Sequence, residues 1–264
     1  MFPDIIIFGR VIGMYSVMAL CGIFAGGINA CIIADKCKYD YADMVIFILI
    51  LSAGAIIGSH LLYALVNYKN IYFVIKNVTN IDSFNKLFIS LNYILGGGVF
   101  YGGLIGGIIT GCVLTKKNAK YKNFIDIVAV NIPLFHFFGR IGCFLGGCCY
   151  GIPGKYGFVY TNNPIVEANY VTRFPVQLLE ALFNIFLFVL LYRFFKNNKY
   201  KNKLIYVYPA VYSIGRFFLE FLRGDKIRGI WLFLSTSQII SIFIVLIVLI
   251  KTCKFSGAGI KSDF

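Results

Sequence analysis

Residues 44–66 read MVIFILILSAGAIIGSHLLYALV, a run that contains one histidine and no aspartate, glutamate, lysine or arginine. About 20 apolar residues suffice for a helix to cross a hydrocarbon core of roughly 30 Å. The chain as a whole is 59% hydrophobic and 14% charged, whereas soluble domains carry about 25% charged residues. Similar apolar segments occupy residues 5–34, 94–115, 124–150, 176–192, 204–222 and 229–250. The sequence therefore predicts an all-α, polytopic membrane protein, with about seven transmembrane helices in one domain (residues 1–264).

The formal net charge is +14. Most lysines and arginines lie between the apolar segments, where they set membrane orientation and attract anionic lipid, so we expect no nucleic acid as a partner. The connections after the first, third and fifth segments, together with the C-terminus, carry about twice as many basic residues as the opposite connections. The positive-inside rule then predicts an N-terminus outside and a C-terminus in the cytoplasm.

Charged side chains also occur within or at the ends of apolar segments. An arginine at the bilayer centre costs at least about 2.5–3.5 kcal/mol, and such residues usually face a bundle interior or a wet cavity. We therefore look for function among these groups, which are the basic residues Arg10, Arg140, Arg216 and Arg223 and the acidic residues Asp126, Glu180, Glu220 and Asp225.

Three of these charges share one helix face. Arg216 and Glu220 are four residues apart, and Arg223 follows three residues later. The stripe has two interpretations: a self-neutralising ladder that only joins helices, or an anion site in which Glu220 tunes an arginine.

A second arginine favours the anion site. Arg140 lies between Gly139 and Gly142, which let another backbone or a ligand approach closely. Two guanidinium groups from different helices match the oxygens of a phosphate. A phosphate reached from within the bilayer indicates a phospholipid headgroup, although chloride or a carboxylate would suit the same arginines.

Two further polar features border apolar segments. Residues 96–107 are rich in glycine around Tyr101, which predicts either a phosphate nest or close helix packing. Pro175 suits a helix start, and Gln177 and Glu180 share a face of the following helix, where interhelical hydrogen bonding is the simplest role.

The sequence also contains three clustered cysteines, Cys143, Cys148 and Cys149. Thiols in an apolar, glycine-rich turn are more often packing groups than a metal or redox site. His60 and His136 are single histidines on apolar segments, and we expect both to be core groups with hydrogen-bond partners.

These segments together resemble the prolipoprotein diacylglyceryl transferase family. Its signature, which begins Gly-Arg-x-Gly-Asn and ends Glu-x-x-Gly, corresponds to residues 139–151, and its His-Gly-Gly-Leu motif corresponds to residues 101–104. The motif Arg-x-Pro-x-Gln-Leu-x-Glu-Ala is intact at residues 173–181, and residues 212–225 keep the two arginines and the glutamate of a further pattern. Tyr15 and Gln238 match a family tyrosine and a family glutamine.

The chain departs from the family at three motif positions. Tyr101 replaces the histidine, and Cys143 and Cys148 replace the signature asparagine and glutamate. Phenol is a poor base because its pKa is about 10, so the proton acceptor is not identified.

The resemblance implies transfer of diacylglycerol from phosphatidylglycerol to the lipobox cysteine of a prolipoprotein, in a bacterial cytoplasmic membrane and without a cofactor or metal. It implies that Arg140, Arg216 and Tyr101 are catalytic. The implied substrate-binding residues are Tyr15, Gly102, Gly103, Gly139, Gln177, Glu180, Glu220 and Arg223.

Three other interpretations stay open at this point. A lipid-binding homologue could have another acceptor or no catalysis, as the replaced motif residues would allow. A transporter would have paired inverted repeats, which the sequence does not display. A thiol-redox protein would depend on Cys143, Cys148 and Cys149.

Overall fold

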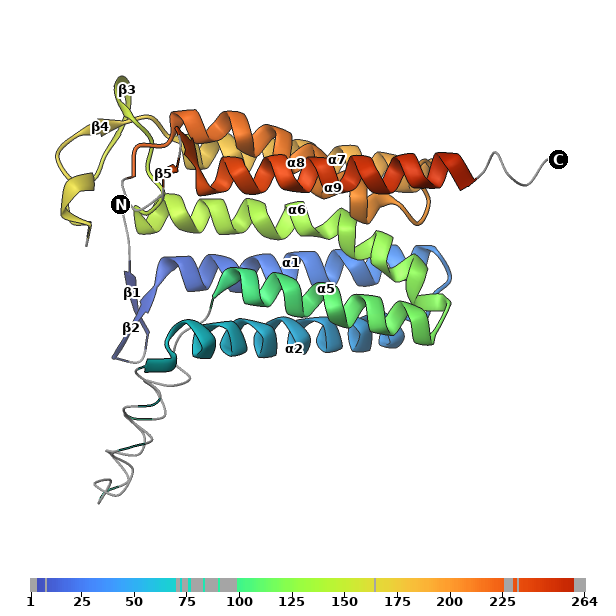
Figure 1. Cartoon of the computed structure of the whole chain (residues 1–264). Coiled ribbons are helices and arrows are strands. Elements are labelled where there is room, and N and C mark those ends of the chain that lie inside the picture. The colour runs from blue at the N-terminus through green and yellow to red at the C-terminus, as the bar shows by residue number, and fades with distance from the viewer. Residues whose placement is uncertain are drawn as a thin grey trace. The chain divides into compact units, whose positions relative to one another are not determined.

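The computed structural model describes residues 4–7, 9–69, 72, 76, 83, 90, 99–163, 165–225, 230, 231 and 233–258. These residues are mainly helical, and Figure 1 gives the element labels. The helices are α1 (Met14–Lys36), α2 (Tyr41–Val66), α5 (Phe100–Lys117), α6 (Lys120–Gly146), α7 (Val176–Lys196), α8 (Leu204–Leu219) and α9 (Thr236–Ala258). Two 3-10 turns, η2 (Val166–Ala168) and η3 (Glu220–Leu222), complete the helical part.

The strands form three small antiparallel sheets. β1 (Asp4–Ile7) pairs with β2 (Arg10–Gly13), β3 (Pro153–Val159) with β4 (Thr172–Arg173), and β5 (Ile230–Trp231) with β6 (Leu234–Ser235). The contacts divide the chain into two compact units. Unit 1 comprises Met1–Ile33 and Ile125–Phe264, and unit 2 comprises Ala34–Phe124. The single domain predicted from the sequence stays a prediction.

Unit 2 is organised by close packing of α2 against α5. A Cβ atom added to Gly58 would lie 2.3 Å from the Gly102 carbonyl oxygen, and one added to Gly106 would lie 2.2 Å from the Gly54 oxygen. Side chains cannot fit at these crossings, so small residues let the two backbones meet, as is common in membrane helices. At the far end of the unit, Lys120 pairs with Asp43 at 2.8 Å.

In unit 1, α1 packs closely on α6. A Cβ atom at Gly142 of α6 would lie 3.1 Å from the Cα atom of Tyr15, and Asn29 donates a hydrogen bond of 2.7 Å to Asn131. Asp126, also on α6, accepts hydrogen bonds from the backbone N–H groups of Asn202 and Leu204. This carboxylate therefore satisfies donors at the start of α8, which have no partner within the helix.

The remaining helices of unit 1, α7, α8 and α9, run side by side (Figure 1), and α8 contacts both α7 and α9. A Cβ atom at Gly215 of α8 would lie 2.3 Å from the ring of Phe183 on α7. Large apolar side chains on the outer face of α7 are exposed, among them Leu182, Phe186 and Val189. Spacings of three and four residues place these three on one stripe, which suits contact with lipid.

The described residues contain four helices that are long and apolar enough to cross a membrane, α1, α2, α6 and α7. Helix α9 includes a shorter apolar stretch, Thr236–Lys251. The prediction of a multi-pass helical membrane protein is therefore confirmed, whereas the number of seven spans and the orientation of the termini stay predictions.

The first apolar segment differs from its prediction. Residues 4–7 and 10–13 form a β-hairpin, and the helix begins only at Met14. Arg10 is exposed on β2, so its assignment to the charges inside helices is wrong. The hairpin is possible because Gly9 adopts a positive φ of 73°, a conformation that glycine allows in a tight turn.

Candidate functional site

The buried charges of unit 1 meet at Glu180 on α7, whose side chain is 2% exposed. An oxygen of its carboxylate lies 2.9 Å from Nη2 of Arg140 on α6 and accepts a hydrogen bond of 2.8 Å from the Tyr212 hydroxyl on α8. The other oxygen lies 3.9 Å from Nη1 of Arg216, also on α8. One carboxylate therefore joins three helices, and it brings together the two arginines that the sequence placed on different segments.

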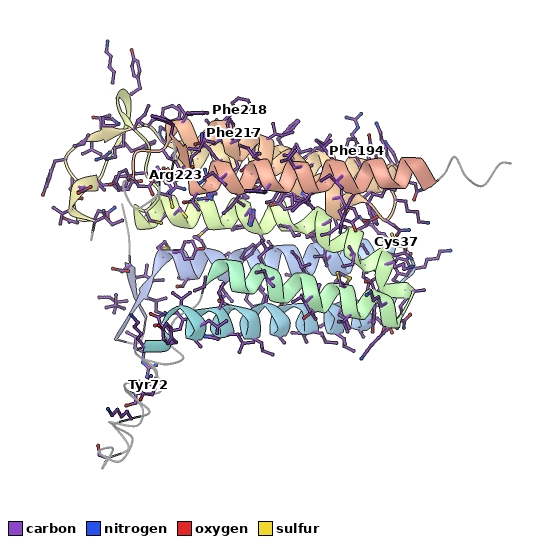
Figure 2. All side chains as sticks on the ribbon, in the orientation of Figure 1. Cys37, Tyr72, Phe194, Phe217, Phe218 and Arg223 are labelled. Atoms are coloured by element: carbon purple, nitrogen blue, oxygen red, sulfur yellow. The ribbon has the colours of Figure 1, made fainter. Side chains whose placement is uncertain are left out.

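The chain of ion pairs continues along the end of α8. Nη2 of Arg216 lies 2.6 Å from Glu220, and the same Glu220 oxygen lies 3.7 Å from Arg223. Arg223 then pairs with Asp225. The predicted stripe of Arg216, Glu220 and Arg223 is confirmed, and Figure 2 shows Arg223 at the end of the helices where β3 and β4 lie.

The six groups alternate in sign, so the chain is electrically neutral as a whole. Neutrality favours stability because a buried charge without a partner costs several kcal/mol. It is also the property expected of a ladder that only joins helices.

Two features go beyond such a ladder. The Arg140 side chain is 19% exposed, against 8% for Arg216, so Arg140 is the more accessible of the two arginines. Nη1 of Arg216 is buried and makes no hydrogen bond within the described part of the chain. A buried donor without an acceptor is costly. The site therefore has one partly exposed arginine and an unused N–H donor on a second arginine.

Other predicted binding residues border this site. Tyr15 on α1 is 50% exposed and lies against Gly142, close enough to Arg140 for the two groups to interact electrostatically. The space beside Gly139 is open, since a Cβ atom there would meet nothing within 4 Å. Gly139 therefore leaves open space at the position before Arg140.

Gln177 has a different environment. Its buried side-chain amide donates hydrogen bonds to the Cys148 carbonyl oxygen (2.9 Å) and to the Tyr160 hydroxyl (3.1 Å). Burial raises the pKa of Tyr160 to about 12, so this phenol stays protonated. Gln177 therefore holds the turn that follows α6, and its role toward a substrate stays a prediction.

This turn carries the cysteine cluster. The Sγ atoms of Cys143, Cys148 and Cys149 all lie within 4.8 Å of one another, and the three residues are free thiols. Hydrogen bonds from the other two thiols lower the pKa of Cys149, whereas the hydrogen bond with Cys149 and burial raise the pKa of Cys148 to about 11.

Several residues at the site were not among the predicted site residues. Tyr212 bonds Glu180, Asp225 ends the chain of charges, and Ser237 on α9 accepts a bond of 3.3 Å from Arg216. Tyr212 and Asp225 begin and end the pattern at residues 212–225, so the sequence contained a signal for both. Arg173 is buried on β4, where its guanidinium stacks over Tyr150 and donates to backbone carbonyls.

The two histidines differ. Nδ1 of His136 is hydrogen-bonded to the Tyr208 hydroxyl at 2.6 Å, which confirms the expectation for this residue. Nδ1 of His60 is buried and has no hydrogen-bond partner among the described residues, so the expectation of a hydrogen-bonded group does not hold at this atom.

Tyr101, Gly102 and Gly103 lie on α5 in unit 2, and the side chain of Tyr101 lies outside what the structure describes. A Cβ atom on Gly102 would lie 2.3 Å from the Gly58 oxygen, so this glycine serves helix packing. The proposed roles of these three residues toward a substrate stay predictions.

Comparison with known proteins agrees with the chemistry of this site. The family model described as prolipoprotein diacylglyceryl transferase matches residues 3–253. A phosphatidylglycerol–prolipoprotein diacylglyceryl transferase of Clostridium tetani is 35% identical over 91% of this chain and 92% of that protein. Proteins of the same name are 31% identical in Clostridioides difficile (84% of this chain, 82% of that protein) and in Finegoldia magna (97% and 96%). The chain therefore belongs to the prolipoprotein diacylglyceryl transferase family.

Proposed function

We propose that this protein is a phosphatidylglycerol–prolipoprotein diacylglyceryl transferase. It moves the diacylglyceryl group of phosphatidylglycerol to the thiol of the lipobox cysteine of a prolipoprotein, and glycerol phosphate leaves. Names of relatives that cover almost the whole chain support this reaction. The observation that carries it is the pair of arginines at Glu180, of which Arg140 is partly exposed and Arg216 has an unused donor.

The chemistry follows from where charge develops. As the bond between glycerol carbon and phosphate oxygen breaks, negative charge accumulates on the phosphate. Arg140 and Arg216 stabilise that charge most strongly in the transition state because they are fixed in advance in a site of low dielectric constant. A planar guanidinium group can also donate two parallel N–H hydrogen bonds to two oxygens of one phosphate.

Neighbouring residues orient these arginines. Glu180 and Tyr212 hold Arg140, whereas Glu220, itself paired with Arg223, holds Arg216. A phosphate that enters beside Gly139 adds one acceptor to the unused Arg216 donor without breaking these pairs. The neutral chain thus serves both as a structural joint and as a preorganised anion site.

The proposal includes a topology. All seven helices cross the cytoplasmic membrane of a bacterium as one domain, with the N-terminus outside and the C-terminus in the cytoplasm. The distribution of basic residues between the connections supports this orientation. The arginine site then lies in the apolar phase, where the lipid donor is located.

The test is a transfer assay with purified protein in detergent. Phosphatidylglycerol labelled in its diacylglyceryl group is mixed with a lipobox peptide, and a peptide with serine in place of the cysteine is the control. We expect label on the cysteine peptide only, with an equal amount of glycerol phosphate released. Binding of phosphatidylglycerol without transfer would refute the proposal and indicate a lipid-binding homologue.

A further inference from the structure

The thiols of Cys143, Cys148 and Cys149 have no part in the phosphate chemistry proposed above, yet they form the tightest cluster of potential metal ligands among the described residues. Cys143 comes from the last turn of α6, and the other two follow directly after that helix. Cys143 is buried, whereas Cys148 and Cys149 are partly accessible. The cluster therefore has an inner side and an approachable side.

The backbone is built to bring these sulfurs together. Gly147 and Cys149 have positive φ angles of 72° and 55°. For a residue other than glycine this conformation costs about 1 kcal/mol or more, and such strain gathers at functional sites. The strained turn is what folds Cys149 back toward the end of α6.

Two buried amides fix the turn in this shape. Asn163 donates a hydrogen bond of 2.7 Å to the Gly147 carbonyl oxygen, and Gln177 donates one of 2.9 Å to the Cys148 oxygen. Side chains that hold a ligand-bearing backbone in place are a regular feature of metal sites. The two amides therefore fix the backbone immediately before Cys149.

The charges nearby suit thiolates. Arg140 lies three residues before Cys143 on α6, so the two residues share a helix face. Arg223 pairs through its backbone with Gly151, two residues after Cys149. Three thiolates and one Zn²⁺ carry a net charge of −1, which the neighbouring guanidinium groups balance. Zinc–sulfur bonds are about 2.3 Å long, so ligand sulfurs in a tetrahedral site lie roughly 3.8 Å apart. The three sulfurs, already within 4.8 Å, need shifts of only about 1 Å.

We propose that Cys143, Cys148 and Cys149 bind Zn²⁺ as thiolates and leave its fourth position for the thiol of the acceptor cysteine. Catalytic zinc sites have three protein ligands and one open position. The role toward the acceptor rests on the function proposed above. Zinc would also take the place of a general base at the site, because zinc-bound thiols lose their proton near neutral pH.

In the proposed transfer, the acceptor thiol releases its proton to water when it binds zinc. Its sulfur then forms a bond to the glycerol carbon, the bond from that carbon to the phosphate oxygen breaks, and glycerol phosphate leaves with the electron pair. The thioether product is a weaker ligand than a thiolate and dissociates. No oxidation or reduction occurs.

The binding test uses Co²⁺, which reports thiolate ligands through a sulfur-to-metal charge-transfer band. Chelator-treated, reduced protein in detergent is titrated with Co²⁺ and then with Zn²⁺. We expect one equivalent of Co²⁺ with a thiolate band that Zn²⁺ abolishes. The band should vanish in the double variant Cys148→Ser/Cys149→Ser and persist in the control Cys112→Ala, which changes a thiol outside the cluster. No band, or equal bands in both variants, would overturn the site.

A second measurement needs no variant and therefore does not depend on folding. Alkylation of the wild-type protein by a maleimide is followed by peptide mass spectrometry with and without Zn²⁺. Zinc should protect Cys148 and Cys149 at least tenfold and leave the labelling of Cys112 unchanged. Equal labelling of all three residues with and without Zn²⁺ would contradict the proposal.

The fourth position is tested separately from transfer. Adding a lipobox peptide to the Co²⁺ protein should increase the thiolate band by about one third, as the ligand set grows from three sulfurs to four, and the serine peptide should leave it unchanged. No increase would overturn the role toward the acceptor, whether or not transfer occurs. Transfer at the full rate after zinc removal would also overturn it and leave the proposed function intact.

Discussion

Arg140→Gln should separate catalysis from stability. Within the described part of the chain, Arg140 makes one ion pair, at 2.9 Å to Glu180, and that carboxylate keeps Arg216 and Tyr212 after the substitution. Removing one partner of a buried pair costs about 3–5 kcal/mol when the other is left alone. Here the remaining partners and the amide of glutamine should reduce the loss to about 1–2 kcal/mol, or roughly 2–8 °C in Tm for a chain of this size.

The same substitution should reduce the transfer rate far more. Loss of one fixed donor to a developing oxyanion costs about 2.7–4 kcal/mol, which is a factor of 10²–10³ in kcat. Initial rates at saturating phosphatidylglycerol and the thermal unfolding of the same preparations give both quantities. Arg193→Gln, at the exposed end of α7, is the matched control and should change neither. An Arg140→Gln rate within fivefold of wild type would refute the role assigned to this guanidinium.

The remaining predictions concern support of the site. Glu180→Gln should cost about 3–5 kcal/mol, lower Tm by about 6–20 °C and abolish transfer, because two buried arginines lose a shared carboxylate; a Tm equal to wild type would contradict the central position of this residue. Asp126→Ala should cost about 1–2 kcal/mol through loss of the α8 cap, measured by thermal unfolding, and no change would refute the capping role. Gly102→Ala should cost about 1–3 kcal/mol by overpacking, whereas Gly107→Ala, where the nearest atom is 3.8 Å away, should not; equal effects would contradict the packing. Gln177→Met should weaken cobalt affinity about 10–100-fold in the titration above, and an unchanged affinity would exclude its positioning role.

Local spacing was enough to predict part of the site. Arg216, Glu220 and Arg223 are three and four residues apart, so helical geometry alone placed them on one face. The same reasoning could not find the partners of Glu180. Arg140 is 40 positions earlier and Arg216 is 36 positions later, and their meeting depends on how three helices pack.

The N-terminal hairpin shows a limit of hydropathy. Residues 5–7 are three isoleucines, and a short apolar run of this kind is typical of both strands and helix ends. The continuous apolar pattern joined them to the following helix, and the turn at Gly9 carried too little signal to separate them. The sequence also identified the three clustered cysteines, but it could not predict that their sulfur atoms meet. That meeting depends on the left-handed backbone at Cys149, which no spacing rule predicts.

The most direct test of the central claim is the intact mass of a lipobox peptide after incubation with purified protein and phosphatidylglycerol of defined acyl chains. With wild-type protein we predict a mass increase equal to one diacylglyceryl group. The added mass should remain after treatment with a thiol reductant at neutral pH, as expected for a thioether. Arg140→Gln should give no such increase within the same time. An unmodified peptide after complete incubation with folded, lipid-bound wild-type protein would contradict the account.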